Sequence, residues 1–156
     1  MTTLSIELRR DPAEPRHFIS TYVNRGTTPL ALTFWWNRRL RVVDAKGVVV
    51  EPSQGPVLPC GVNELWRVLA PGERHDELQT LACTQPAGRS EAIGWAYELT
   101  PGTYRVTLVF ETPPAHGFSQ AEPHAAAFVG RVESNEVELV VPVPAPRSFI
   151  DRLLGR

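Results

Sequence analysis

LTPGTYRVTLVF, residues 99–110, combines a turn and a strand in one stretch and decides the fold class. Pro101 and Gly102 are typical turn residues, because proline presets one backbone angle and glycine accepts the left-handed conformation. From residue 104 onward every second residue is apolar, so that one face of an extended strand carries Tyr104, Val106, Leu108 and Phe110. The pattern predicts a half-buried β-strand that is entered through a tight turn.

The tyrosine that opens this strand indicates the kind of β-structure. A tyrosine directly after a Pro-Gly turn is typical of the tyrosine corner, whose hydroxyl bonds to the backbone a few residues upstream in immunoglobulin-like sandwiches. We therefore predict an all-β protein, an immunoglobulin-like antiparallel β-sandwich of about seven to nine strands with a short C-terminal helical tail. The expected core contains Leu32, Phe34, Leu99, Tyr104, Val106, Leu108, Phe110, Leu139 and Val141.

Length and composition fit one β-domain. A chain of 156 residues can bury a core without a disulfide or a metal, and 15 prolines and 11 glycines suit many short strands joined by turns. A hydrophobic content of 42% with a formal net charge of -1 excludes a disordered chain and one strongly directed to nucleic acid, and we expect no nucleic-acid partner. We expect residues 1–141 to form the sandwich, 142–147 a stiff proline-rich linker and 148–156 a separate tail.

The sequence also predicts a cytoplasmic protein without a membrane partner. Its first residues lack a basic region followed by an apolar run. No later segment approaches the roughly 18 apolar residues that span a bilayer.

Alternating apolar residues predict further strands before the central turn. Residues 4–8 are expected to form an edge strand, and residues 17–24 a strand that places Phe18 and Tyr22 in the core. Residues 30–36 are apolar on both faces, which favours a central strand or one whose outer face carries a tryptophan for a partner.

A first hairpin is expected around a four-residue turn. It joins residues 40–42 to 48–50, with Gly47 at the position that needs a positive φ. The next stretch, residues 51–61, contains three prolines and two glycines, and we expect a surface loop there.

A second hairpin is expected from residues 65–69 and 76–81, with Ala70-Pro71-Gly72-Glu73 as its turn. Residues equally far from the centre of such a turn face each other, which would make Cys60 and Cys83 near neighbours. One alternative is a disulfide between them. The other is a cytoplasmic chain that keeps both thiols reduced.

The last strand region, residues 128–141, changes phase. One alternating set consists of Phe128, Gly130 and Val132 at even positions, and the next consists of Val137, Leu139 and Val141 at odd positions. A β-bulge at Ser134-Asn135 would return both sets to one face, because a bulge inserts one extra residue into a strand.

The tail carries the first candidate binding residues. Phe149, Ile150, Leu153 and Leu154 fall on one side of a short helix that Ser148 can cap. Because helices below about 12 residues are unstable alone in water, the tail is expected to be disordered or docked. It can dock on its own sandwich or on another chain, and the stiff linker favours a second copy or another protein partner.

A second candidate surface follows the central strand. Trp35, Arg38 and Arg39 are predicted to contribute to a protein-binding surface, because aromatic residues and arginine are enriched in interfaces. In the alternative interpretation one tryptophan of the pair packs in the core and the arginines coat the exposed face of the next strand.

No pattern predicts catalysis or a cofactor. The chain has no G-x-S-x-G, no H-E-x-x-H, no Walker loop and no glycine-rich dinucleotide turn. His116 and His124 lie in one proline-rich stretch near two glutamates, so a metal-binding protein is an alternative, although loop histidines are usually solvated. We predict a chain that is not an enzyme.

The turn residues resemble those of a bacterial immunoglobulin-like module found in BsuPI-type intracellular proteinase inhibitors and in deuterolysin-like metallopeptidases. The resemblance covers roughly Phe18 to Val141 and implies the sandwich fold, and for the inhibitors a protease as partner. We therefore predict a non-catalytic protein-binding module, adaptor or regulatory, with an intracellular proteinase inhibitor as the alternative. The resemblance rests on Asn24-Arg25-Gly26, Leu32-Thr33-Phe34, Val43-Asp44-Ala45-Lys46-Gly47, Leu69-Ala70-Pro71-Gly72-Glu73, Trp95 and Pro101-Gly102-Thr103-Tyr104.

Overall fold

The computed structural model describes residues 3–33, 38–57, 66–81, 93–112 and 125–143. These residues are all-β, with thirteen strands and no helix, and accordingly none of their elements is a helix long and apolar enough to cross a membrane. The strands are β1 (Leu4–Arg10), β2 (His17–Asn24), β3 (Leu30–Thr33), β4 (Arg38–Asp44), β5 (Val49–Val50), β6 (Gln54–Val57), β7 (Trp66–Leu69), β8 (Arg74–Thr80), β9 (Ile93–Ala96), β10 (Gly102–Thr112), β11 (Ala126–Ala127), β12 (Gly130–Glu133) and β13 (Val137–Val141).

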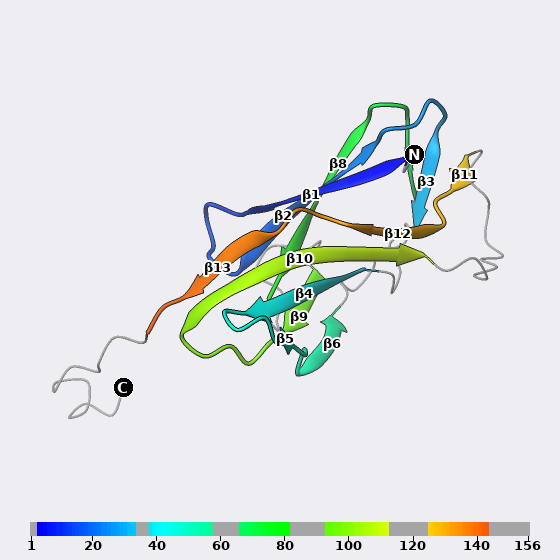
Figure 1. Cartoon of the computed structure of the whole chain (residues 1–156). Coiled ribbons are helices and arrows are strands. Elements are labelled where there is room, and N and C mark those ends of the chain that lie inside the picture. The colour runs from blue at the N-terminus through cyan, green and yellow to red at the C-terminus, as the bar shows by residue number, and fades with distance from the viewer. Residues whose placement is uncertain (1–2, 34–37, 58–65, 82–92, 113–124, 144–156) are drawn as a thin grey trace, which may run out of the picture.

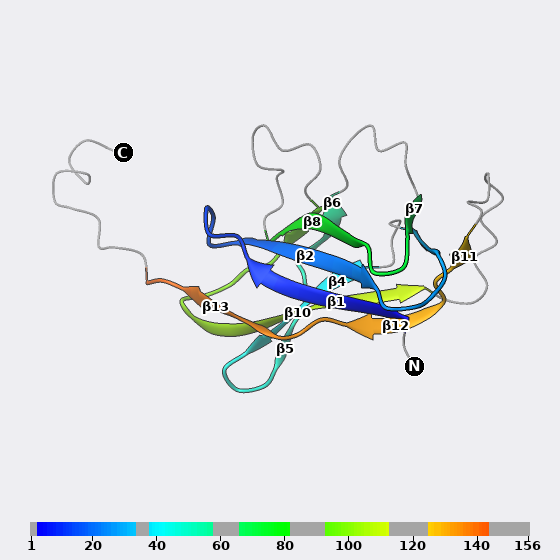
Figure 2. The ribbon, with the colours of Figure 1, turned by 90° about the horizontal axis from the view of Figure 1, so that it is seen from above.

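The strands form three sheets, which we name after their central strands. The β2 sheet has the order β1-β2-β8-β9-β6, and Figure 2 shows β1, β2 and β8 side by side in this order. The β10 sheet has the order β12-β10-β4-β5, with β13 also paired to β10. In Figure 1 the long strand β10 runs between β4 and the pair β12 and β13. The small β3 sheet has the order β11-β3-β7.

All three sheets contribute to one core. Tyr22 of β2 and Phe110 of β10 meet edge to face with ring centroids 5.6 Å apart, a favourable geometry for aromatic pairs. Phe128 extends the contact, with its ring 5.8 Å from that of Phe110. Phe18 and Tyr22 are fully buried, as predicted. Both large sheets therefore cover the same apolar interior.

The tyrosine corner is confirmed. The Tyr104 hydroxyl donates a hydrogen bond to the carbonyl oxygen of Thr100 at 2.8 Å, across the turn that precedes β10. Most of the predicted core is also buried, namely Leu32, Tyr104, Val106, Leu108, Phe110, Leu139 and Val141. Leu99 is only half-buried and packs against this cluster, and Phe34 lies outside the described residues.

The predicted bulge is present between β12 and β13. Glu133 faces Val109 and Val137 faces Val106, so residues 134–136 stand opposite only two residues of β10. Ser134 binds Leu108 twice, by its backbone N–H to the Leu108 carbonyl and by its hydroxyl, which accepts the Leu108 N–H, each at 2.9 Å. The extra residue returns the apolar side chains of both strands to the core face.

The first hairpin is confirmed, and proline limits its length. Gly47 has a φ of 85°, as its turn requires, and β4 pairs with β5. The register would place Pro52 opposite Leu40, but proline has no N–H to donate. The Tyr97 hydroxyl, next to β9 of the other large sheet, donates to the Leu40 carbonyl in its place.

This buried phenol makes stability fall at high pH. Burial, with the Glu51 carboxylate adding to it, raises the pKa of Tyr97 to about 12, and burial also raises the pKa of Tyr22. A tyrosine in the unfolded chain has a pKa of about 10. The raised pKa of Tyr97 therefore stabilises the fold fully below that pH, and this stabilisation is lost as the pH rises through about 12. We expect urea denaturation to show decreasing stability over this window, with a shallower decrease for Tyr97→Phe. Parallel curves for the variant and the wild type would contradict this.

The second predicted hairpin is wrong, although its turn forms. The Glu73 N–H donates to the Ala70 carbonyl at 2.9 Å, but β7 pairs with β3 and β8 with β2. Asn24 explains the separation. Its backbone carbonyl accepts from Gly72, while its side-chain amide donates to the Leu69 carbonyl, so the end of β2 holds the turn and the two arms diverge.

The separation also removes the register argument for the cysteines. Cys60 and Cys83 lie outside the described residues, and the hairpin that would place them face to face is absent.

The prediction of a surface loop at residues 51–61 is wrong for Gln54–Val57, which forms β6. Among the described strands it pairs with β9 alone and stands last in the order of the β2 sheet, and proline is tolerated at such an edge. Short strands of this kind, together with β5 and β11, raise the count within the described residues above the seven to nine predicted. The edge position of β1 is confirmed, and β3 is central in its small sheet.

Candidate partner-binding site

Strand β4 sends two predicted binding residues in opposite directions. Side chains alternate along a strand, so Arg38 points into the core and Arg39 points outward. Arg38 is 6% exposed and forms an ion pair with Glu77 of β8, whose side chain is 15% exposed. The expectation that Arg38 coats an exposed face is therefore wrong, because a buried carboxylate from the other large sheet holds it inside.

The pair belongs to an internal polar cluster on the core face of β2 and β8. The His75 ring nitrogen Nε2 lies 3.7 Å from the Glu77 carboxylate, and Gln79 donates to the Ser20 hydroxyl at 3.1 Å. Arg38 supplies the positive charge that compensates Glu77. The cluster is enclosed between the sheets, which gives it a structural role.

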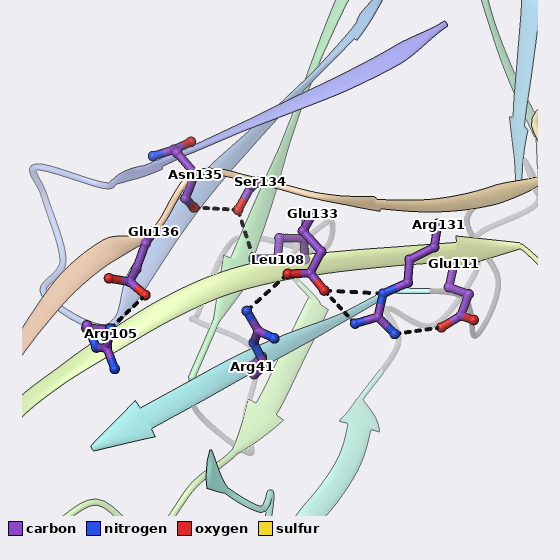
Figure 3. A network of polar contacts seen from close by, with 9 residues as sticks. All are labelled: Arg41, Arg105, Leu108, Glu111, Arg131, Glu133, Ser134, Asn135 and Glu136. Atoms are coloured by element: carbon purple, nitrogen blue, oxygen red, sulfur yellow. Dashed lines mark hydrogen bonds and ion pairs between the residues drawn. The ribbon is translucent and has the colours of Figure 1, made fainter. Parts of the chain in front are cut away.

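The outer face of the β10 sheet carries a network of ion pairs, which Figure 3 shows from close by. Arg41 of β4 reaches Glu133 of β12 at 3.0 Å, across the middle strand β10. Arg131 bridges Glu133 and Glu111, the latter at 3.5 Å. The hydrogen bond from Arg131 lowers the pKa of Glu133. The charges at this end of the face are thus compensated within the chain.

The opposite end of the same face combines apolar side chains with a few charged ones. The register places Val49 beside Val43 and Val43 beside Arg105, which faces Glu138 of β13, and it places Thr103 beside Val140 in the next row. Val49 is 48% exposed and Val140 is 47% exposed. We call these residues, Val43, Val49, Thr103 and Val140 with the stem of Arg105, the valine strip.

Arg39 is the one sequence candidate on this face that the structure describes. It is exposed and stands beside Val109, in the row that ends at Glu133. Among the described residues it forms no ion pair of its own, but its positive charge adds to those of Arg131 and Arg41 in lowering the pKa of Glu133.

The other sequence candidates, Trp35, Phe149, Ile150, Leu153 and Leu154, lie outside the described residues. His116 and His124 do as well. Within the described part of the chain, no group of three or more histidine, cysteine, aspartate or glutamate side chains could hold a metal ion.

Sequence reasoning missed the valine strip. The hairpin predicted around Gly47 correctly places Val43 opposite Val49. Their proximity to Val140 depends on β10 lying between β4 and β13, and no local pattern encodes this order.

No protein-family model matches this chain, and a search of curated proteins finds no significant match either. The resemblance to BsuPI-type inhibitors and deuterolysin-like modules therefore stays a prediction from turn residues.

Proposed function

We propose that this chain is a non-catalytic protein-binding module, adaptor or regulatory, whose partner meets the outer face of the β10 sheet. The valine strip is the observation that supports this proposal. A sheet face turned to water normally carries polar side chains. Apolar side chains gathered on an exposed face, next to polar ones, are typical of interaction surfaces.

The division of this face supports the choice of the strip over the charged end. At the charged end Arg41, Glu133 and Arg131 already compensate one another, so a partner would have to replace existing ion pairs. At the strip, burial of Val49 and Val140 releases apolar surface from water at about 25 cal/mol per Å². Arg105, whose stem belongs to the strip, can add a polar contact at its rim.

The proposed architecture is an immunoglobulin-like sandwich. The tyrosine corner at Tyr104 and the core shared by the two large sheets support it. In such folds the sheet faces and the connecting loops are both used for binding, and function depends on the site and not on the fold. The proposal keeps the cytoplasmic location and the helical tail that the sequence predicts.

Affinity capture tests the proposal with matched surface variants. Immobilised full-length wild type, Val140→Glu and Val129→Glu are incubated with lysate of the source cell, and bound proteins are identified by mass spectrometry. Val129 is 53% exposed but lies outside the strip, so it serves as the control. We expect a protein that wild type and the control retain and that Val140→Glu loses by about tenfold or more, since a buried charge without a counter-charge costs over 1.4 kcal/mol.

Equal capture by all three proteins would refute the assignment of the strip. A panel of proteases, assayed in parallel, tests the alternative that the chain is a proteinase inhibitor. Stoichiometric inhibition of one protease would assign that role.

A further inference from the structure

We infer that the valine strip receives the C-terminal segment, residues 148–156, of a second copy of this chain. The inference rests on the proposed function and names its partner. It follows from the dimensions of the strip, from where β13 ends, and from the charge beside the strip.

The strip is long enough to hold the segment. The strip crosses four strands, β5, β4, β10 and β13, which are about 4.8 Å apart, so it is about 14 Å long. Nine residues of helix rise about 14 Å. The apolar side of the segment, from Phe149 to Leu154, takes up about 8 Å of this length and therefore fits within the strip.

The position of the tether favours another molecule. β13 ends at Val141, which faces Gly102 at the strip's own end of the sheet. The six following residues, PVPAPR, contain three prolines and would extend about 19 Å in a polyproline conformation. The middle of the chain's own strip lies only one to two strand spacings, about 5 to 10 Å, from β13. A stiff spacer of this length overshoots its own strip and can reach that of a neighbour.

A negative charge beside the strip also favours the C-terminal segment as its occupant. Glu138 of β13 faces Arg105 in the register, is exposed, and forms no ion pair with any residue that the structure describes. The segment carries Arg152 and Arg156, either of which can pair with this carboxylate. If each copy places its segment on the strip of the other, the two copies make identical contacts and form a closed twofold dimer.

Complementation between two full-length variants tests the inference by analytical ultracentrifugation. Val49→Glu places a charge in the strip, far from the tether, and Leu153→Glu places one in the segment. We expect a dimer for wild type and for the control Val129→Glu, and monomers for each of the two variants alone. An equimolar mixture of the two variants should form a heterodimer, because one intact strip meets one intact segment. The mixture should bind at least about tenfold more weakly than wild type, since one of two linked contacts is lost.

A wild type that stays monomeric at all concentrations would overturn the inference, as would a dimeric Val49→Glu or a mixture that does not associate. Circular dichroism melting checks that each variant is folded, and Val140→Glu serves as a second strip variant. A monomeric wild type that still captures a protein in a Val140-dependent manner would refute the second copy as partner and leave the proposed function standing.

Discussion

Replacing Arg38 by methionine is expected to lower the free energy of unfolding by about 3 to 5 kcal/mol. The change leaves the Glu77 carboxylate inside the core without its positive partner, and an uncompensated buried charge is among the most destabilising lesions in a protein. Urea denaturation at neutral pH measures the effect. The double variant Arg38→Met/Glu77→Leu should recover most of the loss, because two apolar side chains can replace a buried ion pair at little cost.

An exposed ion pair provides the matched control. Arg9 and Asp76 lie 3.3 Å apart, with side chains 50% and 54% exposed, so Arg9→Met should cost less than about 1 kcal/mol. If Arg38→Met proved as mild as this control, or if the double variant were less stable than Arg38→Met, the pair would not be the buried element described here.

The second large effect is expected for Asn135→Ala, at about 1 to 3 kcal/mol. The Asn135 side chain accepts the Leu8 N–H at 2.7 Å and donates to the Leu8 carbonyl at 2.9 Å, as a neighbouring strand would. Asn135 is exposed, so water can reach the Leu8 groups once the amide is removed, and the cost is the net loss of two hydrogen bonds. Each such hydrogen bond contributes about 0.5 to 1.5 kcal/mol.

Two further variants make this prediction specific. Glu136→Ala, at the next residue, removes only an exposed ion pair with Arg105 and should change stability by less than about 0.5 kcal/mol. Asn135→Asp keeps the acceptor for the Leu8 N–H but faces the Leu8 carbonyl with a carboxylate, so it should not restore stability. Hydrogen exchange at the Leu8 amide should accelerate in the alanine variant, and an unchanged rate would contradict the role of Asn135.

The features that the sequence predicts correctly depend on neighbouring residues. The corner at Tyr104 needs only the preceding Pro-Gly turn, and Gly47 needs only the positive φ of its hairpin. The bulge at Ser134 follows from a change of phase that is visible within one strand region. Each is a local constraint on the backbone, and each is confirmed.

The predictions that fail depend on which distant strand is the partner. The turn at residues 70–73 forms as expected, yet Asn24 holds it to the end of β2 and its arms enter different sheets. Arg38 is buried because it pairs with Glu77, which is 39 residues away in sequence and lies on the core face of β8. The proline content of this stretch argues against a strand at Gln54–Val57. The strand forms at the edge of its sheet, where proline is tolerated.

The candidate site follows the same rule. Arg39 can be placed on an exposed face from the alternation of β4 alone. The valine strip cannot be found this way, since Val49 and Val140 are 91 positions apart and are brought onto one face only by the order of four strands.

The bond between Asn135 and Leu8 links the beginning of the chain to a residue made 127 positions later. At a synthesis rate of roughly 5 to 20 residues per second, β1 leaves the ribosome about 6 to 25 s before the side chain that covers its edge. Over this interval the edge of the first strand is open to strands of other nascent chains. Chains that terminate before residue 135 keep it open permanently. Premature termination of this protein is therefore expected to yield aggregating products, and chaperone demand should be highest while its last strands are being made.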